Sequence, residues 1–345
     1  MRLSTPVEKT APLLEITDLT VGYTGADGNR VVLVDSVSLR VDPGEVLCLV
    51  GESGSGKSVT MLAVLGLLAP PLTVFSGSVR YRGRELVGAD DESLRRLRGS
   101  ELGMIFQDPM TSLNPVRRVG VQIERALAVH QRMDARSRRR KVIELLAAVG
   151  IPQPQERSRA YPHEWSGGMR QRAMIAMAMA NDPDVLIADE PTTALDVTIQ
   201  AQLMEVLAAA RERSGAAMVL ITHDLGLVAQ HADRVAIMYA GRVVETGTVR
   251  QIFDDAAHPY TRGLQRGLLG QHATEPGARA YAIPGSPPPP TARPAGCGFA
   301  PRCEFSGKEH ACAAAPPALV PFGANRSLAC PPAVAASLTG QDVPA

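Results

Sequence analysis

The chain has 345 residues, 45% hydrophobic and 21% charged, a balance typical of a soluble globular protein of about two domains. A net charge of +1 and an aromatic content of 4% exclude a basic field or a base-stacking platform, so we expect no nucleic-acid partner. No apolar stretch approaches the roughly 18 residues of a membrane span, and the first residues lack the apolar core of a signal peptide. These features predict a cytoplasmic protein.

The N-terminal part of the chain predicts strands and then a strand–loop–helix unit. Residues 14–21 and 31–41 alternate apolar and polar side chains, as half-buried antiparallel strands do. Residues 46–50 are apolar throughout, which is typical of a central parallel strand covered by helices on both faces. A glycine-rich loop and an apolar-periodic helix follow this strand directly.

The glycine-rich loop matches G-x-x-x-x-G-K-[ST] in full. Its glycines let successive backbone N–H groups point at phosphate oxygens, and the following helix adds the positive end of its dipole. We expect Lys57 to contact the β- and γ-phosphates of a nucleoside triphosphate and Ser58 to ligate Mg²⁺. The predicted nucleotide-binding residues of this loop are Gly51, Glu52, Ser53, Gly54, Ser55, Gly56, Lys57 and Ser58.

The rest of the core predicts an α/β fold interrupted by a helical subdomain. Residues near 103–183 are mainly helical, with amphipathic stretches at about 121–131 and 137–149. Apolar strands at 185–188 and 217–221 flank a helix at about 197–213, so strands and helices alternate as in a parallel sheet. Residues 235–238 and 242–245 predict a hairpin. We therefore expect a parallel-sheet core, a small antiparallel sheet, a helical subdomain and a short C-terminal extension.

Polar side chains end two of the predicted parallel strands. Asp189 and Glu190 follow four apolar residues, where two carboxylates are costly unless a metal or a base role uses them. We expect Asp189 to hold Mg²⁺ and Glu190 to orient and deprotonate an attacking water. His223 ends the next strand, where a side chain can touch the γ-phosphate and hold that water.

A second phosphate-binding surface lies at the start of a later helix, at Ser166-Gly167-Gly168-Met169. A serine cap followed by two glycines leaves backbone N–H groups free at the positive end of this helix. One nucleotide does not need both surfaces, so we expect this one to bind the nucleotide held by a second protomer. A small-molecule kinase with a phosphate loop would not need it.

The order of these motifs resembles the ATP-binding cassette of ABC transporters. The matching positions are the phosphate loop, Gln107, Ser166-Gly167-Gly168, Asp189-Glu190, Ala194-Leu195-Asp196 and His223. The signature of that family usually reads LSGGQ and here reads WSGGM, which keeps the Ser-Gly-Gly core. The resemblance implies a P-loop NTPase fold, adenine stacking on Tyr23, a catalytic and Mg²⁺-sensing role for Gln107, and a place for Asp196 at the dimer seam.

Three further stretches resemble the ATP-binding subunits of oligopeptide/dipeptide and nickel importers: residues 106–115, residues 258–264, and residues 283–288 with 296–303. The resemblance implies an ATPase that powers peptide import from the cytoplasmic face of the cell membrane. It also implies a second homologous ATP-binding subunit, two permeases and an extracytoplasmic binding protein as partners. The loop 108–115 would then dock a permease helix. The alternatives are nickel or another small solute as cargo, or a soluble ABC ATPase in DNA repair or translation.

We divide the chain into a nucleotide-binding domain at 1–250 and a C-terminal extension at 251–345, where a proline run at 286–290 predicts a linker or strap.

Cys48 lies in an apolar strand and is expected to be a small buried hydrophobe. The other cysteines are Cys297, Cys303, Cys312 and Cys330. In a reducing compartment they suggest a metal, although their spacing lacks the C-x₂-C pairs of most structural zinc sites. The resemblance implies a [4Fe–4S] cluster, and zinc and free thiols stay open.

Overall fold

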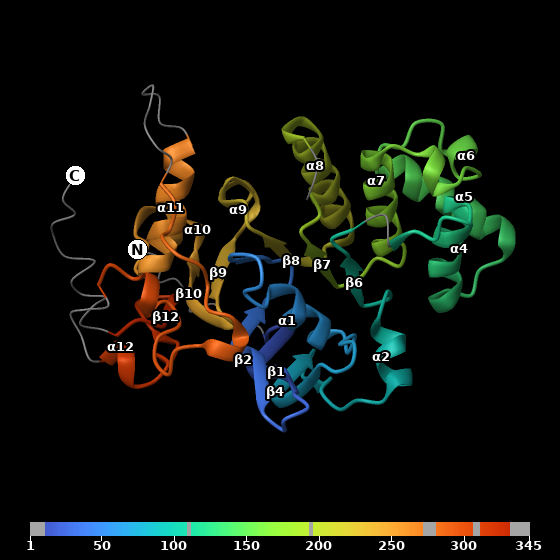
Figure 1. The fold of residues 1–345 in the computed structure, drawn as a ribbon. Coiled ribbons are helices and arrows are strands. Elements are labelled where there is room, and N and C mark those ends of the chain that lie inside the picture. The colour runs from blue at the N-terminus through green and yellow to red at the C-terminus, as the bar shows by residue number, and fades with distance from the viewer. Residues whose placement is uncertain (1–10, 109–111, 193–195, 272–280, 306–310, 332–345) are drawn as a thin grey trace, which may run out of the picture.

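The computed structural model describes residues 11–108, 112–192, 196–271, 281–305 and 311–331. Within these ranges the strands form two sheets. The smaller sheet is antiparallel in the order β2-β1-β4-β5, and the larger sheet has the order β11-β12-β10-β9-β3-β8-β7-β6. Figure 1 shows the helices α4 to α7 on one side of the larger sheet and the C-terminal elements on the other.

The smaller sheet confirms the two predicted antiparallel strands and adds two more. Its members are β1 (Leu14–Thr24), β2 (Arg30–Val41), β4 (Thr73–Tyr81) and β5 (Arg84–Glu85). β1 is central and pairs with β2 on one edge and β4 on the other. Leu14, Leu19 and Val21 lie in the core, where each is at most 1% exposed, because the register of β1 shifts between Ile16 and Leu19. The sheet therefore packs one apolar face against α1 (Lys57–Val64).

The larger sheet has a parallel core around β3. The strands of this sheet are β3 (Val46–Val50), β6 (Leu102–Ile105), β7 (Val185–Asp189), β8 (Ala217–Thr222), β9 (Arg234–Tyr239), β10 (Arg242–Thr248), β11 (Val320–Pro321) and β12 (Ser327–Leu328). β3 pairs in parallel with β8 and β9, and β7 lies between β8 and β6. All five residues of β3 are buried, as predicted for a strand covered on both faces.

The predicted hairpin is confirmed by the antiparallel pairing of β9 with β10. Its turn has positive φ at both central residues, 44° at Ala240 and 83° at Gly241. Such turns match the twist of the flanking strands, and glycine takes the second position without strain.

The helical subdomain begins later than predicted. Residues 102–105 form β6, which pairs with β7 and therefore belongs to the parallel sheet. The expectation that the helical insertion starts near residue 103 is wrong at this point. Gly103 explains the close packing: a Cβ there would lie 2.9 Å from the carbonyl oxygen of Ala178, so the end of α7 rests directly on β6.

The helices agree with the predicted amphipathic stretches. The helical subdomain holds α4 (Val119–His130), α5 (Ala135–Ala148), α6 (Pro154–Arg157) and α7 (Gly167–Ala178). The remaining α-helices of the described chain are α2 (Asp91–Leu97), α8 (Val197–Ser214), α9 (Leu225–His231), α10 (Val249–Asp254), α11 (Pro259–Gln271) and α12 (Ala311–Ala314). Among the residues that the structure describes, no helix has the length and apolar character needed to cross a membrane.

The C-terminal extension contacts the core at several points. β12 pairs with β10 and so lengthens the larger sheet. Arg326 forms a buried ion pair with Glu245 of β10, with 2.6 Å between Nη2 and Oε1. After the proline run, Arg293 donates to the carbonyl oxygen of Leu33 in β2 at 2.8 Å.

A substitution at Gly22 tests the close contact between β1 and β2. A Cβ at this position would lie 2.1 Å from the carbonyl oxygen of Val31 and 2.8 Å from the ring of Phe75. We expect Gly22→Ala to force the strands apart and to lower the free energy of unfolding by about 2 kcal/mol, measured by urea unfolding. Gly267→Ala in α11 is the control, because a Cβ there would meet its nearest atom at 3.6 Å. An equal loss in both variants would contradict the clash.

Candidate functional site

The phosphate loop joins the carboxyl end of β3 to the first turn of α1. Gly54 and Gly56 have φ values of 77° and 101°, which lie in the region that favours glycine. Gly51 approaches the hairpin so closely that a Cβ would lie 2.1 Å from the carbonyl oxygen of Met238. The loop is therefore supported from below by β9, and its backbone bends as the motif predicts.

Lys57 is the buried cation of this loop. Its Nζ donates to the carbonyl oxygens of Gly51 at 2.7 Å and Glu52 at 2.9 Å, and lies 3.4 Å from Oγ of Ser55. Burial lowers the pKa of Lys57, and the carboxylates of Glu190, Asp189 and Glu52 oppose that shift. A buried ammonium group can bind phosphate oxygens strongly once they replace one of these acceptors.

The hydroxyl of Ser58 and the carboxylate of Asp189 meet at the end of the loop. Oγ of Ser58 donates to Oδ1 of Asp189 at 3.0 Å, which links the start of α1 to the end of β7. Asp189 is 5% exposed, and burial raises the pKa of its carboxyl group. The bond from Ser58 and the charge of Lys57 lower this pKa, whereas Glu190 raises it. A hydroxyl and a carboxylate are ligands that Mg²⁺ prefers.

Glu190 lies at the centre of the predicted catalytic residues. Nε2 of Gln107 donates to its Oε2 at 3.2 Å, and Nδ1 of His223 lies 3.5 Å from its Oε1. The side chain of Glu190 is 15% exposed, whereas that of His223 is 66% exposed. Glu190 also has a φ of 44°, a strained value for a residue with a Cβ. The fold therefore brings these three residues together, as the sequence predicts.

The signature surface begins α7 in the helical subdomain. Ser166 is the N-cap and its Oγ accepts from the backbone N–H of Met169 at 3.3 Å. Ser166 and Gly167 are exposed, and nothing lies within 4 Å of a Cβ at Gly167. Gly168 is more enclosed, since its Cβ would lie 3.3 Å from Ile199. α7 packs with α4 and α5 on the side of the molecule opposite α11 (Figure 1).

A contact that the sequence did not reveal links this helix to the acidic strand end. The amide nitrogen of Gln171 in α7 is buried and donates to the carbonyl oxygen of Pro191, one residue after Glu190. Asp196 caps α8 by accepting from the N–H of Ile199 at 2.9 Å, a local role that its place in the motif did not predict. Ala194 and Leu195 lie outside the described residues, as do positions 109–111 of the loop after Gln107.

Tyr23 lies near the end of β1 and pairs with Val31 of β2. Its side chain is partly buried. The contacts described above do not connect it to Lys57 or Glu190, so its predicted stacking on adenine stays a prediction.

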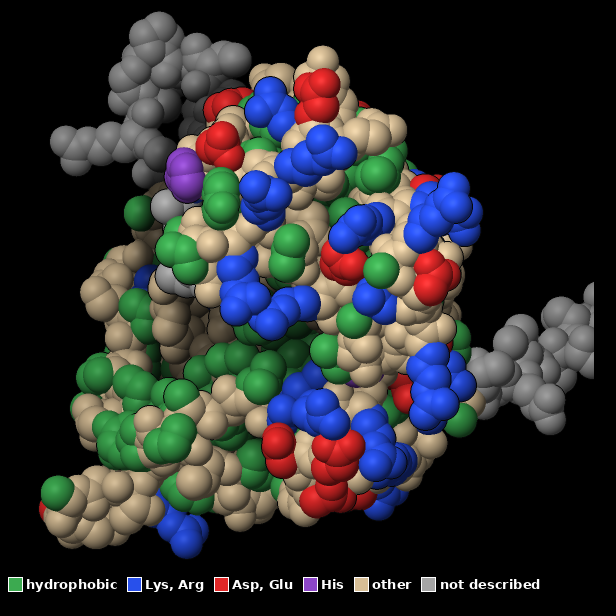
Figure 2. Space-filling view, turned by 90° about the vertical axis from the view of Figure 1, so that its right-hand side faces the viewer, with side chains coloured by type: hydrophobic (Ala, Val, Ile, Leu, Met, Phe, Trp, Pro, Cys, Tyr) green, Lys and Arg blue, Asp and Glu red, His purple; other side chains and the backbone are tan. Residues whose placement is uncertain are grey.

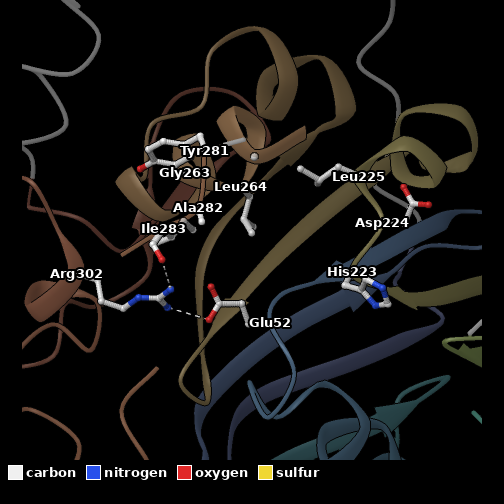
Figure 3. Close-up of a pocket in the computed structure, with 11 residues that line it drawn as sticks. Glu52, His223, Asp224, Leu225, Gly263, Leu264, Tyr281, Ala282, Ile283 and Arg302 are labelled. Atoms are coloured by element: carbon white, nitrogen blue, oxygen red, sulfur yellow. Dashed lines mark hydrogen bonds and ion pairs between the residues drawn. The ribbon is translucent and has the colours of Figure 1, made fainter. Parts of the chain in front are cut away.

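Two residues of the C-terminal extension reach the phosphate loop, and sequence patterns gave no sign of this. The backbone N–H of Glu52 donates to the hydroxyl of Tyr260 at 2.9 Å. The carboxylate of Glu52 pairs with Nη1 of Arg302 at 2.8 Å, as Figure 3 shows. A pocket of about 590 Å³ opens beside this pair and extends to His223. Tyr260 and Arg302 lie in stretches 258–264 and 296–303, which resemble peptide importers, but the sequence analysis assigned neither residue a role.

An aromatic cluster holds the extension against the hairpin. The rings of Tyr239 and Tyr260 lie 4.6 Å apart, and that of Phe299 lies 5.2 Å and 5.4 Å from them. His258 contacts Phe299, and its Nδ1 accepts from the N–H of Tyr260 at 3.1 Å. Burial lowers the pKa of His258 to about 4, although the carboxylate of Glu245 opposes that shift.

The four cysteines of the extension influence one another. The N–H of Cys297 donates to the carbonyl oxygen of Cys312 at 2.8 Å. Burial, and then the neighbouring thiols, raise the pKa of Cys303 to about 11 and that of Cys330 to about 12. Within the described ranges, however, no three His, Cys, Asp or Glu side chains are close enough together to hold a metal ion. Cys48 is fully buried in β3, as predicted.

Two family models match the chain. A model described as "ABC transporter" matches residues 34–193, and one described as "Oligopeptide/dipeptide transporter, C-terminal region" matches residues 244–312. The oligopeptide transport ATP-binding protein OppD of Mycobacterium tuberculosis is 52% identical over 93% of this chain and 52% of its own length. The chain thus spans about half the length of this relative. A Brucella abortus protein named for peptide import and ATP binding is 48% identical over 94% of this chain and 96% of its own length.

Solved structures of nucleotide-binding cassettes share the fold. The ATP-binding cassette MJ0796, in a dimeric post-hydrolysis state bound to ADP and Pi, aligns with a TM-score of 0.62 and 27% identity. The alignment covers 69% of this chain and 99% of that one. The protein cbiO1 from Clostridium perfringens aligns with a TM-score of 0.60 and 25% identity, over 76% of this chain and 98% of its own.

The buried histidine of the aromatic cluster predicts acid sensitivity. His258 has an unfolded pKa near 6.5 and a folded pKa of about 4, so the unfolded chain binds a proton first as the pH falls. Its contribution to stability is present above pH 6.5 and is lost below it, by about 2 kcal/mol between pH 7 and pH 5. We expect His258→Asn, which keeps an acceptor for the N–H of Tyr260, to show a correspondingly smaller loss in urea unfolding. An unchanged pH dependence in the variant would contradict this assignment.

Proposed function

The chain belongs to the family of ABC transporter ATP-binding proteins that carry the oligopeptide/dipeptide C-terminal region, and on that premise we propose that it hydrolyses ATP to drive peptide import. The observation that carries this proposal is the meeting of Lys57, Ser58, Asp189 and Glu190 at the carboxyl ends of β3 and β7. A phosphate loop opposite a pair of carboxylates is the arrangement that phosphoryl transfer to water requires.

The proposed roles of the site residues follow their positions. Lys57 and the N–H groups of residues 51–58 bind the phosphates and hold the γ-phosphoryl group in place. Glu190 accepts a proton from the attacking water, which is the role of a carboxylate within reach of that water. Gln107 and His223 bind Glu190 from two sides and orient it. Tyr23 would contact the adenine.

The residues fit Mg²⁺ as the accompanying ion. Ser58 and Asp189 present oxygen atoms to the same point. Gln107, whose side-chain nitrogen donates to Glu190, would add its amide oxygen to the ion. Mg²⁺, when bound, would neutralise charge on the phosphate oxygens. Burial raises the pKa of Asp189, and a cation beside it would stabilise the ionised carboxylate.

A second ATP-binding subunit is the proposed partner for the signature surface. Ser166 and Gly167 are exposed at the positive end of α7, where backbone N–H groups can bind phosphate. Gly168, Met169 and Asp196 would border the same contact. This surface lies on the helical subdomain, so it is free to face a nucleotide held by another protomer. The dimeric MJ0796 cassette bound to ADP and Pi has this chain's fold, which is consistent with such a pairing.

The proposed permease contact is an apolar groove next to Gln107. The groove has a volume of about 310 Å³ and is lined in part by Leu67, Met104 and Met177. Phe106, directly before Gln107, is 41% exposed at its edge. Figure 2 shows a hollow with hydrophobic side chains on this face, with Lys and Arg around it. A peripheral place at the membrane, with two permeases and an extracytoplasmic binding protein, follows from this assignment.

We further propose that the extension holds a [4Fe–4S] cluster. The four cysteines supply the thiol donors that such clusters use. The backbone hydrogen bond from Cys297 to Cys312, 2.8 Å long, supports the proposal by bringing two of them close together. The thiols therefore fit the chemistry of an iron–sulfur cluster. In the part of the chain that the structure describes, they do not lie close enough together to form a metal-binding group. No step of ATP hydrolysis depends on this cluster.

Glu190→Gln separates ATP binding from hydrolysis. The amide keeps the shape of the side chain but cannot accept the proton, so we expect phosphate release to fall by about 10²- to 10³-fold. The affinity for MgATP should stay within about threefold of the wild type. In cells that lack the native gene, the variant should also fail to restore uptake of a labelled peptide.

Glu205→Gln, on the exposed face of α8, is the control and should keep both activities. Wild-type hydrolysis in Glu190→Gln would contradict the role of Glu190. Full peptide uptake in cells without the gene would show that the cargo is another solute, or that the ATPase serves a process other than transport.

Metal analysis tests the cysteine proposal. We expect the anaerobically purified protein to absorb near 400 nm and to contain about four irons and four sulfides per chain. Cys303→Ser should lose the absorption, and Cys48→Ala should keep it, because Cys48 is buried within β3 and is not one of the four cysteines of the extension. One zinc without colour would make the site a structural zinc site, and no metal would refute the cofactor.

A further inference from the structure

Glu52, the second residue of the phosphate loop, is held by the C-terminal extension through two different groups. Its backbone N–H donates to the hydroxyl of Tyr260, and its carboxylate pairs with the guanidinium of Arg302. Its carbonyl oxygen accepts from Nζ of Lys57. The backbone and side chain of one loop residue are thus fixed by residues 208 and 250 positions later in the chain.

Other hydrogen bonds also hold the guanidinium group of Arg302 in place. Its Nε donates to the carbonyl oxygen of Pro284 at 2.9 Å, and Nη2 donates to that of Ile283 at 3.3 Å. Nη1 also donates to the hydroxyl of Tyr239 at 3.2 Å. The side chain of Arg302 is only 6% exposed, so it has no freedom to swing away. Figure 3 shows it beside the pocket, with Glu52 between it and His223.

The extension does not need this contact for its attachment. Arg326 binds Glu245, Arg293 binds the backbone of β2, and β12 pairs with β10. A buried ion pair is by itself weak evidence for added stability, because desolvation offsets the attraction. The position of Arg302 against the phosphate loop therefore calls for an explanation beyond anchoring.

We propose that Tyr260 and Arg302 are positioning residues of the nucleotide site, which hold Glu52 so that the phosphate loop keeps the shape that binds MgATP. This inference rests on the proposed function, since it assigns the extension a part in the same ATP site. Its physical basis is preorganisation: a loop held by buried contacts loses less freedom when the phosphates bind. Lys57 benefits directly, because the two carbonyl groups that orient its ammonium belong to Gly51 and Glu52.

The test is the affinity for MgATP, measured by calorimetry on the purified full-length chain, together with steady-state hydrolysis in the assembled transporter. We expect Arg302→Gln to raise Kd and KM for MgATP about fivefold to tenfold, while kcat changes less than twofold. Tyr260→Phe removes the acceptor for the N–H of Glu52 and should weaken binding in the same direction. Arg302→Lys keeps the charge but not the fork of donors, and should restore part of the affinity.

Arg326→Gln is the matched control, because it removes a buried arginine that anchors the extension without contacting the phosphate loop. It should lower the melting temperature and leave Kd for MgATP unchanged. Since Arg302 acts through Glu52, the double variant Glu52→Gln/Arg302→Gln should bind no more weakly than Arg302→Gln alone.

Unchanged Kd and KM in both Arg302→Gln and Tyr260→Phe would overturn the inference. An equal loss of affinity in Arg326→Gln would also overturn it, because the extension would then act through general stability. Failure of the wild type to bind MgATP would instead refute the proposed function on which the inference rests.

Discussion

The position of β3 between β8 and β9 is the constraint on which the functional residues depend. β3 is buried on both faces, so it can lie only in the middle of the sheet. Its last residue, Val50, is level with Thr222 of β8 and Ile237 of β9, and Asp189 of β7 is level with Ile221. Because parallel strands end at the same edge, the phosphate loop, the two carboxylates and His223 meet there.

The balance of charge at this edge is maintained by one lysine and three carboxylates. Lys57 lies among Glu52, Asp189 and Glu190. Burial lowers the pKa of Lys57 and raises that of Asp189, in each case toward the uncharged form. Arg302 offsets one of the carboxylates by pairing with Glu52. The remaining two, Asp189 and Glu190, are left facing the loop, where a cation and a proton acceptor are needed.

Much of the site could be predicted because its signals are local. The phosphate loop, Asp189-Glu190, His223 and the helix cap at Ser166 are each readable from neighbouring residues, and the structure brings Gln107, Glu190 and His223 together as expected. Local apolar patterns also predicted β1, β3, β8 and the hairpin. The start of the helical subdomain was misplaced, because Leu102–Ile105 is too short to distinguish a buried strand from a helix.

The contacts that no local signal could reveal are those between distant segments. Tyr260 and Arg302 bind Glu52 across more than 200 positions of the chain, and nothing in their own sequence context names a partner. The same is true of the bond from Gln171 to Pro191, which depends on how α7 packs over the sheet. The arrangement of the four cysteines likewise depends on how the extension folds onto β10.

These long separations also govern how the chain is made. Synthesis adds roughly 5–20 residues per second, so about 10–50 s pass between the appearance of Glu52 and that of Arg302 on the ribosome. Until residues 217–239 have been made, β3 has neither β8 nor β9 beside it, and contacts between distant segments form only after the loop between them closes. The apolar central strand β3 of the N-terminal half therefore stays unpaired until those strands have been made. The contacts of Tyr260 and Arg302 with Glu52 can form only after the C-terminal extension has been made.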